Sequence, residues 1–127
     1  RDQDAADCHD VKQKLVAICQ DAGKSCTVVR IACRELESWY FGELKAVEQA
    51  LGISHLSAQS KKAKYRVPDE IHRPSDALKK ITKGVYLKVA GSREIGKHIN
   101  PDPNQNSSKS YQQFINGLFK ALAYEHL

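Results

Sequence analysis

Residues 25–43 read SCTVVRIACRELESWYFGE, and this stretch decides the expected fold. Its first part, 25–33, is rich in β-branched residues and nearly continuous in apolar character, which predicts a strand covered on both faces. The preceding residues, 5–22, repeat apolar side chains at helical spacing and stop at Gly23, which predicts an amphipathic helix. A helix, a short turn and a buried strand make half of a βαβ unit. We therefore expect an α/β protein with a mostly parallel central sheet, in which a further strand precedes Asp2.

The remainder of the chain predicts a helix-rich C-terminal half. One domain is expected over residues 1–127, because a chain of this length forms a single core. The segment 52–74 is irregular and basic, and 100–110 is a polar loop ahead of the last helix. The stretch VYLKV (85–89) fits either a strand or the start of a helix. Helices are predicted at residues 43–51, at 75–83 with Ser75 as the cap, at 91–99 and at 110–124.

Composition and charge narrow the class of protein. Hydrophobic residues make up 41% of the chain and charged residues 28%, and no apolar run is long enough to span a membrane. We therefore expect a cytoplasmic protein without a membrane partner. Residues 1–52 carry seven Lys/Arg against nine Asp/Glu, whereas residues 53–127 carry thirteen against six. Solvated surface charge explains this asymmetry, but it also suits a divalent-cation site beside a phosphate-binding surface.

The four cysteines give no sign of a metal or disulfide framework. Their spacing contains no C-x-x-C pair, and no histidine lies at ligand spacing beside two of them. Two fall on the apolar side of the first predicted helix, and two bracket the predicted strand. We expect reduced, buried, structural thiols at Cys8, Cys19, Cys26 and Cys33.

Two pairs of carboxylates are the candidate metal ligands. Asp2 and Asp4 lie two residues apart, so on a strand their side chains point the same way. Glu35 and Glu37 follow the predicted strand, at the edge where parallel strands bind ligands. Two explanations without a site stay open, because Asp4 and Asp7 suit a helix cap and the two glutamates suit the start of the next helix. As a site, the four would bind Mg²⁺ or Mn²⁺.

Cationic side chains of the basic half are the candidates for holding a phosphate backbone. Arg93 ranks first, because a guanidinium binds phosphate in a bidentate way. The run KKAKYRVP (61–68) is either a phosphate-binding cluster or plain solvated charge. Tyr65 within it is expected to pack on the domain rather than to stack on a base. The predicted nucleic-acid-binding residues are Arg93, Lys64, Arg66, Lys61, Lys62 and Lys97.

Several stretches together resemble a bacterial family of domains of unknown function with a Toprim-like (topoisomerase–primase) fold. Members of that family lie beside ABC-type or OLD-like ATPases, in operons that resemble phage-defence systems. The similarity covers essentially the whole chain, and CRELESWYFG (33–42) is its most specific part. The stretches are RDQDAADC (1–8), VRIACRELESWYFGEL (29–44), KYRVPDEI (64–71), PSDALKKI (74–81), GSREIGKHI (91–99) and SYQQF (110–114).

The resemblance implies a Mg²⁺-dependent nuclease, or a related phosphodiester-cleaving domain, that works with an ATPase partner on DNA or RNA in a bacterial defence system. Asp2 and Asp4 match the D-x-D motif of Toprim domains. Glu35 and Glu37 match a further acidic position, so these four carboxylates are the expected catalytic residues. The first Toprim motif, a strand followed by a Gly-rich turn and a glutamate, is expected ahead of Asp2 and is missing here. This departure keeps open a non-catalytic accessory module that binds a partner protein or nucleic acid, and self-association also stays open.

Overall fold

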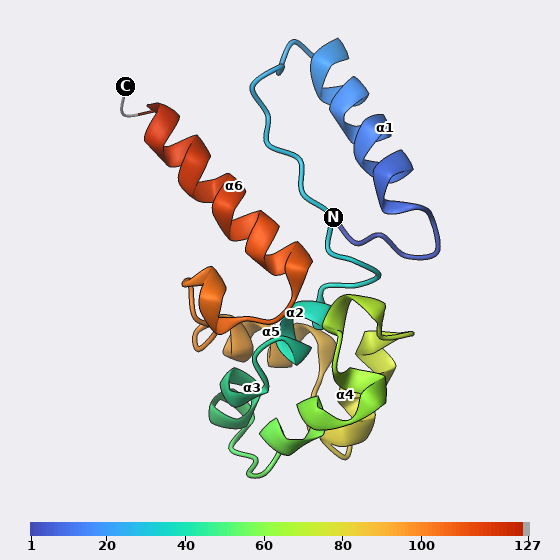
Figure 1. The fold of residues 1–127 in the computed structure, drawn as a ribbon, viewed down its shortest axis with the longest axis vertical. Helices are drawn as coiled ribbons and strands as arrows, with labels where there is room; N and C mark the ends of the chain where they lie inside the picture. Colours follow the sequence, from blue (N-terminus) through green and yellow to red (C-terminus); the bar gives the residue numbers. More distant parts are fainter. Residues whose placement is uncertain (126–127) are drawn as a thin grey trace.

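The chain folds almost entirely into helices joined by extended segments. The computed structural model describes residues 1–125, and 59% of the chain is helical (Figure 1). Four of the helices are single 3-10 turns, namely η1 (Ser57–Lys61), η2 (Ala63–Tyr65), η3 (Pro68–Glu70) and η4 (Pro103–Gln105). The α-helices are α1 (Cys8–Asp21), α2 (Glu37–Phe41), α3 (Leu44–Leu51), α4 (Pro74–Ile81), α5 (Lys88–Gly96) and α6 (Lys109–Glu125).

The expected α/β, Toprim-like fold with a mostly parallel sheet is wrong. Residues 1–125 contain no strand and no sheet, and their only β-pairing is an isolated parallel bridge between Asp2 and Ala32. The bridge rests on two backbone hydrogen bonds, Gln3 N to Ala32 O at 3.0 Å and Ala32 N to Arg1 O at 2.9 Å. The β-branched residues of 25–33 favour an extended backbone locally, but a strand needs a partner along its whole length. Val28 is 45% exposed, so this stretch is not covered on both faces.

The hydrophobic core lies among α2, α3, α4 and α5. The predicted helix at 43–51 is confirmed as α3, with Leu44 and Val47 buried on its inner face. The ambiguous stretch 85–89 leads into α5, which also takes up the helix predicted at 91–99. Each of these short helices stays in place through packing rather than through its own length. The largest buried apolar side chains are Phe41, Val47, Leu78 and Ile95, none more than 1% exposed.

Helix α4 begins differently from its prediction. Ser75 was expected as the cap, but Pro74 is the first helical residue and Arg73 precedes it in a left-handed conformation, with φ of 50°. Proline suits this position, because the first amide of a helix has no partner inside it. The backbone N–H of Ser75 instead donates to the Glu35 carboxylate at 2.8 Å.

Helices α1 and α6 extend away from this core (Figure 1). Asp7 caps α1 by accepting from the backbone N–H groups of His9 and Asp10, so the alternative cap Asp4 is wrong. No residue of α1 is buried. In α6 the first half is anchored, since Tyr111 and Ile115 are buried, as predicted for its apolar stripe. The second half leaves Leu118, Phe119 and Leu122 exposed.

The cysteines are all free thiols, but none is buried. Cys8, Cys19 and Cys33 are half-buried and Cys26 is exposed, so the expectation of four buried thiols is wrong. The reason is the absence of a covering sheet around 25–33. Among residues 1–125, no helix is both long and apolar enough to cross a membrane.

Candidate functional site

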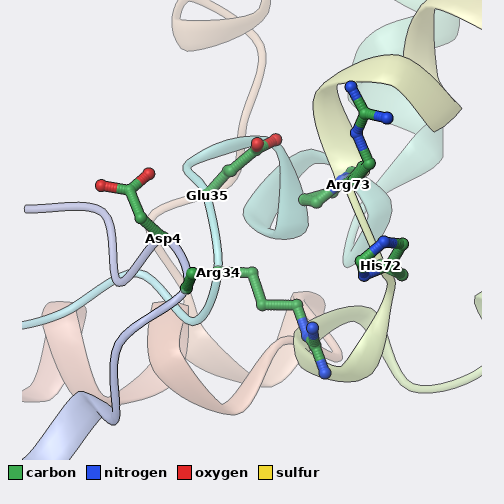
Figure 2. Close-up of a pocket in the computed structure, with 7 residues that line it drawn as sticks. Asp4, Arg34, Glu35, His72 and Arg73 are labelled. Carbon is green, nitrogen blue, oxygen red and sulfur yellow. The ribbon is translucent and has the colours of Figure 1, made fainter.

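A pocket lies where three segments far apart in the sequence meet (Figure 2). It has a volume of about 380 Å³ and is formed by Asp4 with Ala5, by Arg34 with Glu35, and by 72–74. We call it the Arg34 pocket. The isolated bridge brings residues 1–4 beside the chain around Ala32, and the start of α4 closes the third side.

The backbone around the Arg34 pocket is strained at three places. Asp4, Arg34 and Arg73 have φ values of 58°, 67° and 50°, in the left-handed region that non-glycine residues seldom adopt. Such residues cost on the order of 1–3 kcal/mol each and persist only where surrounding contacts impose them. Here Asp4 N donates to Arg34 O at 2.7 Å, and Arg34 N donates to the Gln3 side chain at 3.0 Å. Strain of this kind gathers at binding and catalytic sites.

Glu35 holds the third wall of the pocket in place. Its carboxylate accepts from the backbone N–H of Ser75, 40 residues further along the chain, at 2.8 Å. A carboxylate at this position also complements the positive end of α4. The alternative prediction, that Glu35 stabilises the start of a helix, is therefore correct. The helix is α4, however, and not α2, which directly follows Glu35 in the chain.

Two arginines, Arg34 and Arg73, and one histidine, His72, line the Arg34 pocket. Figure 2 shows Arg34 extending towards the segment that carries His72 and Arg73, while Asp4 points away from them. Arg73 forms an ion pair with Asp76 at 2.9 Å, but both side chains are largely exposed, at 72% and 63%. Exposed pairs of this kind contribute little and exchange easily for another anion. In the part of the chain that the structure describes, the Arg34 guanidinium has no ion-pair or hydrogen-bond partner.

A second pocket continues the positive surface. It measures about 390 Å³, shares His72 and Arg73 with the Arg34 pocket, and adds Lys64 and Lys80. The Lys64 ammonium lies 4.8 Å from the centre of the Tyr65 ring, which fixes the lysine at the rim. We call the two adjoining pockets the cationic groove. Its cations are Arg34, Arg73, Lys64 and Lys80, and it is also lined by His72 and by the carboxylates of Asp4, Glu35 and Asp76.

The four predicted metal ligands are not gathered at one point. Asp4 and Glu35 both line the Arg34 pocket, whereas Asp2 and Glu37 do not. Within residues 1–125, no group of three or more His, Cys, Asp or Glu side chains is placed to hold a metal ion. Burial raises the pKa of Asp2, and the neighbouring Asp4 carboxylate adds to this, against the Leu36 N–H and Lys88. The D-x-D pair is not on a strand, and its role as a metal-binding pair stays a prediction.

Glu37 is a core residue. Its side chain is 1% exposed, and one carboxylate oxygen accepts from the Tyr86 hydroxyl at 2.8 Å. The other oxygen is buried without a hydrogen-bond partner. The Tyr86 hydroxyl also lies 3.0 Å from the Ser92 hydroxyl. Burial, and then the hydrogen bond to Glu37, raise the pKa of Tyr86 far above its ordinary value of 10.0, although Ser92 opposes the shift.

The predicted cations are scattered between the groove and other surfaces. Lys61, Lys62, Lys64 and Arg66 are all exposed around η1 and η2, but only Lys64 lines the groove. Arg93 is exposed on α5 and Lys97 is exposed just after the end of α5; neither lines a pocket of the groove, and Lys97 pairs with Glu94 at 2.9 Å. Tyr65 is 5% exposed and stacks on Phe41, with ring centres 5.0 Å apart. The prediction that Tyr65 packs on the domain rather than stacking on a base is confirmed.

The groove residues that sequence reasoning missed are Arg34, His72, Arg73 and Lys80. The motif IHRPSD (71–76) carries the available signal, because a His-Arg pair directly before the first proline of a helix sits at the helix entrance. No pattern in the neighbouring sequence indicates that Arg34 lines the same pocket as His72 and Arg73.

Comparisons with known proteins place the chain in a family but add no relative of known activity. No curated protein and no solved structure matches it. A family model covers nearly the whole chain, in agreement with the expected likeness to a family of unknown function. The chain belongs to the family described as Domain of unknown function (DUF4276), whose model matches residues 2–119.

Proposed function

We propose that this chain binds the sugar–phosphate backbone of a nucleic acid along the cationic groove. The observation that carries the proposal is the sharing of His72 and Arg73 by two adjoining pockets that also present Arg34, Lys64 and Lys80. A guanidinium fork grips phosphate oxygens, and lysines add point charges along the path. The positive balance of the chain, with a formal net charge of +5, adds long-range attraction.

A polymer suits the groove better than a single small anion. The cations are divided between two pockets, so one phosphate group would leave part of the groove unneutralised. Successive phosphates of one strand would neutralise them together. The strained backbone at Asp4, Arg34 and Arg73 supports the same conclusion, because it maintains the wall of the Arg34 pocket at an energetic cost.

The second candidate function is Mg²⁺-dependent cleavage of that phosphodiester backbone. Asp4 and Glu35 line the Arg34 pocket beside its cations, and Asp2 lies close enough to Asp4 for the two to repel. A divalent cation would relieve this repulsion and could activate water for attack on phosphorus. An ATPase partner and a bacterial defence role in the cytoplasm, both suggested by the resemblance, belong to this second proposal.

Binding is tested by fluorescence anisotropy with labelled single- and double-stranded DNA and RNA over a range of salt concentrations. Loss of one charge-assisted contact costs roughly 1.4 kcal/mol, or about tenfold in Kd, so Arg34→Ala should weaken binding by about tenfold at low salt. Its matched control is Lys120→Ala, an exposed charge on α6 outside the groove. Equal losses in both variants, or affinity that does not fall with salt, would refute the groove.

Cleavage is tested separately with plasmid DNA and RNA in the presence of Mg²⁺ or Mn²⁺. Asp4→Asn should abolish cleavage while leaving nucleic-acid binding in place. Asp7→Asn is the control, because it alters another carboxylate of the same segment that caps α1. Cleavage retained in Asp4→Asn would reject a metal site at Asp4, and no cleavage by the unsubstituted chain with either metal would reject the enzyme; both results leave the binding proposal standing.

A further inference from the structure

A third cavity brings two thiols together. Cys8 is the first residue of α1, Cys33 closes the extended segment 25–33, and both line a pocket of about 320 Å³. Both thiols face this one cavity although 25 positions separate them, and the Cys8 thiol is close enough to contribute to the raised pKa of Cys33. Neither thiol is bonded to another cysteine, and both are half-buried, which leaves them accessible to a small reagent.

We propose that Cys8 and Cys33 form a reversible disulfide that clamps α1 to the rest of the molecule. The other two cysteines make poor competitors. Cys19 is 11 residues beyond Cys8 on the same helix, a rise of roughly 16 Å, whereas bonded cysteines need Cα atoms within about 7 Å. Cys26 is exposed on the loop beyond α1 and does not line the cavity.

The oxidant that the proposal requires is a low-molecular-weight disulfide such as glutathione disulfide. Burial and the nearby Asp69 carboxylate raise the pKa of Cys33, so Cys33 is the poorer first nucleophile. The Cys8 thiolate attacks glutathione disulfide, forms a mixed disulfide and releases one glutathione thiolate. The Cys33 thiolate then attacks the Cys8 sulfur, forms the internal bond and releases the second. Two electrons pass to the glutathione, and the two cysteine protons pass through solvent to the released thiolates.

The proposed disulfide would change how firmly α1 is attached to the rest of the molecule. Helix α1 has no buried residue, so little packing holds it against the body. A bond at its first residue would fix that end to the chain just before Arg34, which lines the groove. The clamp therefore concerns the attachment of α1 and does not depend on the groove binding nucleic acid.

The test incubates the full chain with glutathione disulfide in excess over glutathione, followed by blocking of free thiols and tryptic mass mapping. The expected product links peptide 2–12, DQDAADCHDVK, to peptide 31–34, IACR, with the loss of two hydrogen atoms. The double variant Cys19→Ser/Cys26→Ser should form the same link. Excess dithiothreitol should remove it. The linked chain should also unfold at a higher temperature than the reduced one, by about 10 °C.

The matched controls are Cys8→Ser and Cys33→Ser, each of which should form only a mixed disulfide with glutathione and show no thermal shift. Three results would overturn the proposal. In the first, Cys8 and Cys33 both stay free and react with the blocking reagent. In the second, one of them in the unsubstituted chain keeps a mixed disulfide with glutathione and the internal bond does not form. In the third, either of them is linked to Cys26. A linked chain without a thermal shift would refute the clamp on α1.

Discussion

The buried Glu37–Tyr86 contact predicts an unusually large effect from removing one hydroxyl group. Within residues 1–125, Tyr86 provides the single hydrogen bond of the Glu37 carboxyl group, at 2.8 Å, and the second oxygen of that group has no partner; the Glu37 side chain is 1% exposed. Tyr86→Phe keeps the ring, which packs against Gly91. The substitution therefore changes the hydrogen bonding of the carboxylate while leaving the shape of the core nearly unchanged.

The expected loss of stability depends on whether the Glu37 side chain keeps any hydrogen-bond partner after the substitution. An ordinary hydrogen bond contributes about 1 kcal/mol, but a buried polar group left without any partner costs more, up to about 3 kcal/mol. We expect Tyr86→Phe to lower the free energy of unfolding by about 3 kcal/mol. For a domain of this size that corresponds to a fall in Tm of about 10 °C.

The assay is urea unfolding followed by the fluorescence of Trp39. Tyr111→Phe is the matched control, because the Tyr111 hydroxyl donates to a neutral acceptor, the backbone oxygen of Asn100, at 2.6 Å. It should cost only about 1 kcal/mol. In a Glu37→Gln background the carboxyl group is absent, so Tyr86→Phe should there cost about 1 kcal/mol as well.

Two results would refute this reasoning. A cost for Tyr86→Phe no greater than that for Tyr111→Phe would show that the Glu37 carboxylate does not depend on the tyrosine. An equal cost with and without Glu37→Gln would show that the two side chains are not coupled.

Two further predictions concern stability. Burial raises the pKa values of Tyr86, Tyr40 and Tyr111 above the ordinary 10.0, so the stability they contribute is complete below pH 10 and is lost as the pH rises through their folded-state values. Urea unfolding at successive pH values should show this loss, and less of it in Tyr86→Phe; an unchanged pH dependence would contradict the assignment. Asp69→Ala should lower the free energy of unfolding by about 3 kcal/mol, because Asp69 accepts from Ser110 N at 2.7 Å and from the hydroxyls of Ser108 and Ser110 at 2.6 and 3.0 Å. Asp102→Ala, which removes one exposed cap, is its control and should cost under about 1 kcal/mol; equal costs would refute the role of Asp69.

The site was only partly predictable because its residues act through partners far away in the sequence. Asp4 and Glu35 were chosen from local spacing, and both line the Arg34 pocket. Glu37 was chosen by the same spacing, yet its carboxylate is buried against Tyr86, 49 residues away. No local pattern distinguishes these two outcomes.

What the sequence by itself determined is the longer amphipathic helices. The apolar spacing at 5–22, 43–51 and 110–124 specifies helices through hydrogen bonds four residues apart, which need no distant partner. It did not indicate the 3-10 helices η1, η2 and η3, which fall in the segment 52–74 that was expected to be irregular. Only the tertiary structure decided the rest. The apolar stretch 25–33 stays extended, because a sheet requires partners that pattern alone cannot supply. The cationic groove likewise exists only because long-range contacts, such as Glu35 to Ser75, bring distant cations together.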